Sequence, residues 1–231
     1  MNWDLSLNKQ LRHQQSQFAL DLHFVSAASR LVLFGPSGAG KTLTLKMMAG
    51  IVTPDRGHIT IAGRRLYDHG ARLDLKPQQR RLAYMFQDYA LFPHLTVRQN
   101  IAFARQPRQR AWLNPTRAWS DAVVERWIDA FQLHNIVSHY PHQISGGQRQ
   151  RTALARALAC APSALLLDEP FAALDQRLRQ SLRDELRDLQ AQLKLPMLLI
   201  THDEDDVRAL ADEVVHLQAG RVVRAAAGAT S

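Results

Sequence analysis

The sequence contains little cysteine and no long apolar run. Its 231 residues include a single cysteine, Cys160, so the chain cannot form an internal disulfide and fits a reducing compartment. No run of 18 or more apolar residues occurs, which argues against a transmembrane helix within the chain. The N-terminus has no basic stretch followed by an apolar one, so we expect no secretory signal.

The overall composition is that of a globular protein with an excess of positive charge. Apolar residues make up 46% and charged residues 22% of the chain, which excludes global disorder and is enough for one α/β domain. The net charge is +8, from 29 basic and 21 acidic residues. Such an excess indicates an anionic partner, which composition alone leaves open as nucleic acid, a phosphate ligand or a membrane surface.

Two windows carry the basic excess. Residues 64–81 hold six basic and two acidic residues, and residues 89–120 hold five arginines and no acidic residue. The windows form either a solvated face or one basic surface that meets a partner. Neither has a zinc-ligand pattern, a heptad or an aromatic-rich RNA-binding motif, so we expect no nucleic-acid partner.

Three short apolar runs predict a parallel sheet. The runs are residues 30–34, 164–168 and 197–201, and each is followed by, or ends on, a turn or a polar residue. Helical patterns lie between and after these runs, at about 41–50, 119–133, 147–160, 175–193 and 203–211. Buried strands alternating with helices are typical of an α/β sheet covered on both faces, which binds ligands at the C-terminal strand ends. The first ~60 residues indicate an additional β-rich region.

A glycine-rich segment follows the first of these strands and precedes a helix. It matches the phosphate-binding pattern G-x-x-x-x-G-K-[ST] with Gly35, Pro36, Ser37, Gly38, Ala39, Gly40, Lys41 and Thr42. Glycines let backbone N–H groups converge on phosphate oxygens at the positive end of the helix. Lys41 is expected to reach the β- and γ-phosphates, and the Thr42 hydroxyl to ligate Mg²⁺.

Two further segments suggest phosphate chemistry. Asp168 and Glu169 end a buried strand, where a first carboxylate can hold Mg²⁺ and a second can act on an attacking water. Read alone, this pair is also a common helix start before Pro170. Ser145, Gly146, Gly147 and Gln148 precede a helix and form either a second anion site or a simple N-cap.

Six motifs together resemble the ATP-binding-cassette (ABC) ATPases. In the order and approximate spacing of that family, the chain contains the phosphate loop, Gln87, Ile144-Ser145-Gly146-Gly147-Gln148, Asp168-Glu169, Ala173-Leu174-Asp175 and His202. The resemblance covers roughly residues 3–224. It implies a P-loop NTPase core with a mostly parallel sheet, an N-terminal antiparallel β region and an inserted helical subdomain at about 88–160, all within a single domain over residues 1–231.

The resemblance also implies roles for individual residues. Two cassettes would dimerise head to tail around two ATP molecules, so that Ser145, Gly146, Gly147 and Gln148 of one copy face the ATP of the other, with Asp175 at the interface. Glu169 would act on the water and His202 would contact the γ-phosphate. Thr42, Gln87 and Asp168 would hold Mg²⁺, and Gln87 would also have a catalytic role in positioning the water. An exposed loop glutamine and a strand-end cap are the simpler alternatives for Gln87 and His202.

The sequence departs from the family pattern in three places. Ile144 replaces the usual leucine of the pentapeptide. The region where cassettes place an aromatic residue under adenine is Gln10-Leu11-Arg12-His13-Gln14, so His13, Arg12 or Phe18 are the candidates for base contact. Only eleven residues follow Gly220, so we expect no C-terminal regulatory domain.

ATP hydrolysis in this family drives a separate membrane complex. The resemblance implies permease subunits, contacted through residues 86–103, a periplasmic substrate-binding protein, and a peripheral location on the cytoplasmic face of the inner membrane. For cargo, the phosphate loop, residues 73–81 and Met85-Phe86-Gln87-Asp88 most resemble the molybdate importer ATPases. Sulfate, thiamine and ferric ion cassettes are similar. A soluble cassette acting on nucleic acid or ribosomes and a non-hydrolysing nucleotide-binding module are the alternatives.

Overall fold

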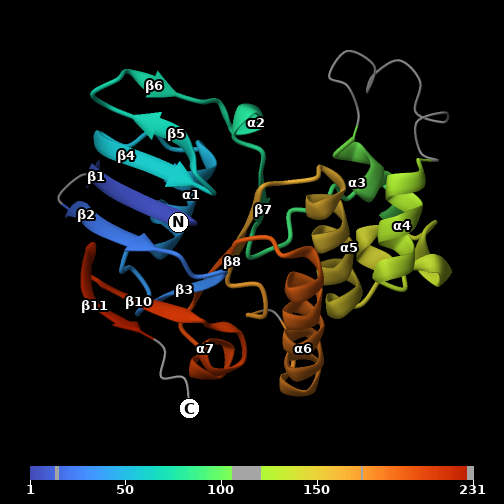
Figure 1. Ribbon diagram of the computed structural model, residues 1–231. Helices are drawn as coiled ribbons and strands as arrows, with labels where there is room; N and C mark the ends of the chain where they lie inside the picture. Colours follow the sequence, from blue (N-terminus) through green and yellow to red (C-terminus); the bar gives the residue numbers. More distant parts are fainter. Residues whose placement is uncertain (14–15, 106–120, 173, 228–231) are drawn as a thin grey trace. The chain divides into compact units, whose positions relative to one another are not determined.

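The computed structural model describes residues 1–13, 16–105, 121–172 and 174–227 (Figure 1). The chain divides into two compact units. The first unit consists of residues 1–82, 163–169 and 183–231, and the second consists of residues 83–162 and 170–182.

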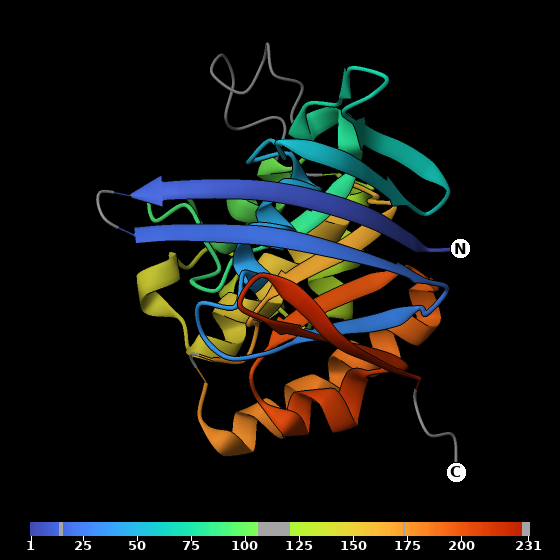
Figure 2. The ribbon, with the colours of Figure 1, turned by 90° about the vertical axis from the view of Figure 1, so that its left-hand side faces the viewer.

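An antiparallel sheet forms the N-terminal part of the first unit, as the β-rich composition predicts. Its strand order is β2-β1-β4-β5-β6, and its strands are β1 (Trp3–His13), β2 (Ser16–Ser26), β4 (Arg56–Ile61), β5 (Arg64–Asp68) and β6 (Leu73–Asp74). Figure 2 shows β1 and β2 as two long strands running side by side. Alternate side chains of this pair are buried, which places one face in the core, as in Trp3, Leu5, Leu7, Leu20, Leu22 and Phe24.

A second sheet of the same unit contains the three strands that the sequence predicts. They are β3 (Arg30–Phe34), β8 (Ala164–Asp168) and β9 (Met197–Thr201), with the predicted bounds. The strands β10 (Glu213–Gln218), β3, β9 and β8 lie parallel in that order, and β11 (Arg221–Ala227) pairs antiparallel with β10. Every residue of β8 and β9 is buried, which explains why their sequences are continuously apolar rather than alternating.

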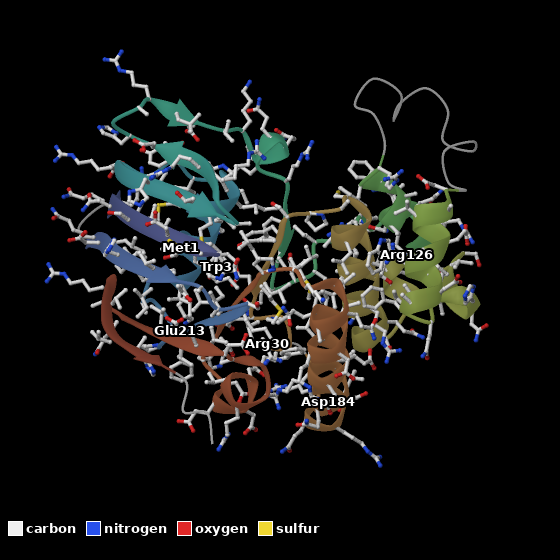
Figure 3. The ribbon with its side chains drawn as sticks, viewed as in Figure 1. Met1, Trp3, Arg30, Arg126, Asp184 and Glu213 are labelled. Atoms are coloured by element: carbon white, nitrogen blue, oxygen red, sulfur yellow. The ribbon has the colours of Figure 1, made fainter. Side chains whose placement is uncertain are left out.

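Side-chain hydrogen bonds tie the start of β1 and the end of β2 to their neighbours. The fully buried indole of Trp3 donates from Nε1 to the Ala28 carbonyl at 2.9 Å. The Ser26 hydroxyl donates to the Glu213 carboxylate at 2.6 Å (Trp3 and Glu213 are labelled in Figure 3). The second of these bonds joins β2 to the start of β10, so the two sheets of the first unit are linked by polar groups as well as by apolar packing.

The predicted helices of the first unit are present with small shifts at their ends. Helix α1 (Lys41–Ala49) follows the glycine-rich segment, and α7 (Glu204–Leu210) follows β9. The sequence pattern did not predict α2 (Pro77–Arg80), a single turn. Helix α6 (Gln176–Leu193) belongs to the first unit from residue 183 onward. No described helix is long and apolar enough to cross a lipid bilayer.

One arginine of the first basic window is part of the core rather than of a basic surface. Arg80 has no exposed surface, and its guanidinium donates to the carbonyls of Met47 and Met48 at the end of α1 and to that of Leu75. It also pairs with Asp74 at 2.9 Å. This arginine satisfies carbonyls that a helix C-terminus leaves without partners, so it contributes to the fold and not to a charged face.

The second unit is mostly helical, in agreement with the helical region expected between the phosphate loop and the strand that ends at Asp168. Its elements are β7 (Leu82–Met85), α3 (Val97–Phe103), α4 (Ala122–Ala130), α5 (Gly146–Ala159) and the 3₁₀ turns His134–Ile136 and Pro141–Gln143. The first residue of β7, Leu82, is the last residue of segment 1–82 of the first unit. Helices α4 and α5 correspond to the predicted helices over 119–133 and 147–160. The pattern did not predict α3, whose N-cap Thr96 and capping partner Gln99 were readable in the sequence.

The second basic window is partly neutralised inside this unit. Arg98 pairs with Glu125 of α4, and Arg105 pairs with Asp121 at 2.6 Å. Arg108, Arg110 and Arg117 lie outside the described residues. The described arginines of this window therefore contribute less net positive charge to the surface than the sequence count suggests.

Candidate nucleotide-binding site

The polar residues that follow the parallel strands lie at one edge of the sheet. Phe34 at the end of β3 is in register with Thr201 at the end of β9, and Asp168 at the end of β8 is in register with Ile200. The glycine-rich loop follows β3, Glu169 follows β8 and His202 follows β9. Strands that end in register bring residues distant in sequence to one place, which is the edge where α/β sheets bind ligands.

The glycine-rich loop needs its glycines at two points. A Cβ at Gly35 would lie 2.1 Å from the Leu217 carbonyl oxygen of β10, so a side chain there would displace the strand. Gly40 is the N-cap of α1 with φ +102°, a conformation that side chains disfavour. Because Gly40 has no side chain to cap the helix and the first turn of α1 has no acidic residue, the helix start is suited to an anion.

The ammonium group of Lys41 lies over the loop. Its Nζ donates to the carbonyls of Gly35 at 2.6 Å and Pro36 at 3.0 Å, and the residue is 5% exposed. Burial lowers the pKa of Lys41 below its usual value, and the carboxylates of Glu169 and Asp168 oppose that shift. The carboxylates thus help keep a buried cation charged beside the loop, as a phosphate-binding lysine requires.

The two predicted metal ligands of this unit are adjacent. The Thr42 hydroxyl donates to Asp168 Oδ1 at 3.2 Å, and Asp168 is 4% exposed. Mg²⁺ prefers oxygen ligands and is held in proteins by one or two such groups together with substrate phosphates and water. The hydroxyl and the carboxylate fit this ion, and when bound it would neutralise charge on the β- and γ-phosphate oxygens.

Glu169 and His202 are also brought together. His202 Nδ1 lies 3.2 Å from Glu169 Oε1, and the Glu169 backbone N–H donates to the Ile200 carbonyl at 3.0 Å. The histidine side chain is 58% exposed and the carboxylate only 16% exposed. Glu169 has φ +44°, an uncommon left-handed conformation of the kind that clusters at functional sites.

One of the three candidates for base contact lies against the phosphate loop. A Cβ at Gly40 would meet the Phe18 ring at 3.1 Å and the Leu20 side chain at 2.7 Å, so these side chains pack on the loop. Phe18 is on β2. The side chains of Arg12 and His13 lie outside the described residues.

The second predicted anion segment is an N-cap in the second unit. The Ser145 hydroxyl accepts from the Gln148 N–H at 3.3 Å, and the Gln148 side chain accepts from the Ser145 N–H at 2.9 Å. This is a reciprocal capping box, the simpler of the two interpretations that the sequence allowed. It leaves Ser145 exposed at the start of a 14-residue helix, and its role toward ATP stays a prediction.

Two of the predicted interface motifs are packed together in this unit. A Cβ at Gly146 would lie 3.1 Å from Leu174, and one at Gly147 would lie 2.9 Å from Leu178. Asp175 accepts from the Leu178 N–H at 3.0 Å and so caps α6. The glycines therefore allow α5 to approach the start of α6 closely. Ala173 lies outside the described residues.

Gln87 lies in an exposed turn two residues after β7. Two side chains that the sequence pattern did not single out donate hydrogen bonds to backbone carbonyls of the following segment, residues 89–96. Fully buried Asn100 donates from Nδ2 to the Phe92, Leu95 and Thr96 carbonyls, and Arg156 donates to the Tyr89 and Ala90 carbonyls at 2.8 Å. For Arg156, a charged residue within the apolar run 153–159 was the available signal.

Comparison with known proteins places these residues in a family. The family described as "ABC transporter" matches residues 21–172. The chain is 42% identical over 198 residues to the sulfate/thiosulfate import ATP-binding protein CysA of Mesostigma viride, an alignment that covers 86% of this chain and 54% of that protein. It is 41% identical over 216 residues to the CysA of Synechococcus elongatus, covering 94% and 59%. The chain spans little more than half the length of these relatives.

The fold has solved counterparts. Two structures of the ATP-binding cassette MJ0796, both dimeric and one bound to ADP and Pi, superpose with a TM-score of 0.78, 24% identity and 98% coverage of both chains. This likeness shows the fold, a P-loop cassette with an antiparallel N-terminal β region. Together with the family match and the curated relatives, it shows that the chain belongs to the ABC transporter family, whose ATPases bind ATP with Mg²⁺.

Proposed function

We propose that the chain is the ATP-hydrolysing motor subunit of a binding-protein-dependent importer, with sulfate or thiosulfate as its cargo. The observation that supports hydrolysis most directly is the cluster at the sheet edge, in which Lys41, the Thr42–Asp168 pair and the Glu169–His202 pair surround one phosphate loop. A protein that only binds nucleotide has no need of a carboxylate and a histidine placed together beside the phosphates.

Each residue has a definite task in this proposal. The loop N–H groups and Lys41 bind the phosphates, and Thr42, Asp168 and Gln87 hold Mg²⁺. Glu169 accepts a proton from the attacking water, and His202 donates a hydrogen bond to the γ-phosphate. Phe18 is the candidate of the three for contact with the base, because its ring packs on Gly40.

The remaining motifs belong to the partners. Ser145, Gly146, Gly147 and Gln148, with Asp175 beside them, face the ATP of a second copy in a head-to-tail dimer. The segment 86–103 meets transmembrane permease subunits, and Phe103, which is 42% exposed, packs there against the Phe92 ring at a tilt of 50°, with ring centroids 4.4 Å apart. The permease holds the motor peripherally at the cytoplasmic face of the inner membrane, and a periplasmic binding protein delivers the cargo.

The proposed cargo, sulfate or thiosulfate, replaces the molybdate that the sequence resemblance indicated. The two CysA relatives carry the name sulfate/thiosulfate import over most of this chain, whereas the sequence resemblance to molybdate cassettes rests on a few short segments. Sulfate and molybdate are both tetrahedral dianions, so the motor itself has no reason to distinguish them. Selectivity belongs to the permease and the binding protein.

The test is a purification of the tagged chain from its own cells, followed by ATPase and uptake assays. We expect permease subunits to accompany the chain, Mg²⁺-dependent ATP hydrolysis by the complex, and uptake of labelled sulfate that unlabelled thiosulfate reduces. Uptake of molybdate alone would reassign the cargo. Nucleic acid or ribosomes in place of permease would assign the soluble-cassette alternative, and ATP binding without turnover would assign a nucleotide-binding module.

A further inference from the structure

A buried ion-pair cluster includes both sequence neighbours of His202, and none of the predicted motifs describes this cluster. Arg183 of α6 is 4% exposed and Asp206 of α7 is 3% exposed. The Arg183 guanidinium donates from Nε to Asp206 Oδ1 at 2.7 Å and from Nη2 to Asp203 Oδ2 at 3.0 Å. Burying an arginine and a carboxylate together requires close, well-directed hydrogen bonds, because both groups lose their hydration.

A threonine hydroxyl links this cluster to the end of β9. Thr201, 2% exposed, donates from Oγ1 to Asp206 Oδ2 at 2.6 Å and accepts from the Asp203 N–H at 3.0 Å. The two oxygens of Asp206 are thus held by different residues, one by Arg183 and one by Thr201. Burial raises the pKa of Asp206, while the hydrogen bonds from Thr201 and Arg183 lower it, so the carboxylate depends on these donors to stay charged.

The cluster holds the backbone on both sides of one residue, His202. Thr201 precedes His202 and is fixed by strand pairing and by its hydroxyl. Asp203 follows His202; its side chain accepts from Arg183 and, at 2.8 Å, from the Asp205 N–H. The His202 side chain itself is mostly exposed. An exposed side chain keeps one direction only if its backbone is rigid, and a catalytic group displaced by about 1 Å can lose about 100-fold in rate.

We propose that Thr201, Asp206 and Arg183 are positioning residues that hold His202 beside Glu169 and in reach of the γ-phosphate of a nucleoside triphosphate. This inference rests on the proposed function for its substrate. It adds that the turn from Thr201 to Asp206 is held rigid in the single chain, before any second copy or permease is bound.

The first test replaces the hydroxyl alone. Thr201→Val keeps the shape of the side chain and removes its hydrogen bonds, whereas Thr201→Ser keeps the hydroxyl. We expect Thr201→Val to lower kcat for ATP hydrolysis by about 10- to 100-fold with KM and ATP affinity unchanged, and Thr201→Ser to restore most of the rate. Arg208→Ala is the control, because its pair with Asp205 on the same helix is exposed.

The second test separates positioning of His202 from a general loss of structure. In a His202→Ala background, we expect Thr201→Val to cause no further loss of kcat, because the group that it positions is absent. An additive loss in the double variant would overturn the proposal. So would a Thr201→Val protein whose ATP affinity falls together with kcat.

A third measurement does not depend on turnover. The His202 imidazole resonances, assigned by their loss in His202→Ala, are expected to shift or broaden in Thr201→Val and to stay in place in Thr201→Ser and Arg208→Ala. Unchanged resonances in Thr201→Val would contradict the positioning role. If the wild-type complex fails to hydrolyse ATP while these shifts appear, the proposed function is wrong and the positioning of the histidine still stands.

Discussion

The two units differ in how much of a nucleotide site each builds within itself. In the first unit, the ends of parallel strands bring Thr42 to Asp168 and His202 to Glu169, beside a loop that Lys41 bonds to. In the second unit, the side chains of Ser145 and Gln148 each accept from the other residue's backbone N–H as a helix cap, and Gln87 lies in an exposed turn. A sheet edge gathers distant residues through strand register, whereas a helix start presents residues adjacent in sequence.

This difference teaches where each unit's chemistry resides. The first unit brings a carboxylate next to a histidine, and a hydroxyl next to a second carboxylate, within the single chain. The second unit offers N–H groups and a small hydroxyl, which gain a role only when a phosphate is brought to them. Changes in the first unit should therefore alter binding and chemistry in the single chain, and changes in the second should alter steps that need a second copy.

The largest effect is expected for Glu169→Gln. The amide is close in size to the carboxylate but cannot accept a proton from water, so we expect turnover to fall by about 10³-fold with ATP affinity retained. ATP should then accumulate in a stable dimer, visible by size-exclusion chromatography with ATP and Mg²⁺. Turnover near the wild-type rate in this variant would remove Glu169 from the catalytic role.

Arg80→Met tests how much the buried Arg80 guanidinium stabilises the first unit at the end of helix α1. Losing the guanidinium leaves the Met47, Met48 and Leu75 carbonyls without these donors and removes the ion pair of Asp74, so we expect the free energy of unfolding to fall by about 3 kcal/mol. Chemical denaturation measures this. Arg65→Met, at an exposed arginine of the same basic window, is the control, and an equal loss in both would contradict a core role for Arg80.

Lys41→Ala tests whether the first unit binds ATP by itself. Charge-assisted hydrogen bonds to phosphate contribute about 1.5–3 kcal/mol, so we expect ATP affinity to fall by about 100-fold in the isolated chain. Equilibrium binding of a fluorescent ATP analogue measures it, with Lys46→Ala at the other end of the same helix as the control. Unchanged affinity would contradict the phosphate-loop assignment.

Ser145→Ala gives the smallest effect and separates a cap from an anion site. Losing an N-cap costs about 1 kcal/mol of stability, and Thr96→Ala removes the matching cap of α3, with the same capping box. We expect both variants to lose similar stability, but only Ser145→Ala to lower ATP turnover, by about tenfold, at protein concentrations that favour the dimer. Equal turnover in the two variants would leave Ser145 as a cap alone.

The local features of the fold and site were predictable because they depend on short segments. The apolar runs at 30–34, 164–168 and 197–201 are strands with the predicted bounds, and the phosphate loop lies between a strand and a helix as its pattern requires. Helix α3 and the burial of Arg80 were not predicted. Helix α3 has seven residues, too few for a clear apolar period, although its capping box was readable. The burial of Arg80 depends on carbonyls 32 and 33 residues away, about which a local pattern carries no information.

The amino-acid sequence by itself determined the family, the phosphate loop and the residue types available for hydrolysis. Only the tertiary structure decided that Thr42 meets Asp168, 126 residues away, that His202 meets Glu169, 33 residues away, and that Arg183 is buried against Asp206. The reason is physical. Turns and caps are governed by neighbours along the chain, whereas these contacts exist because parallel strands end in register and because a buried charge must find an opposite one.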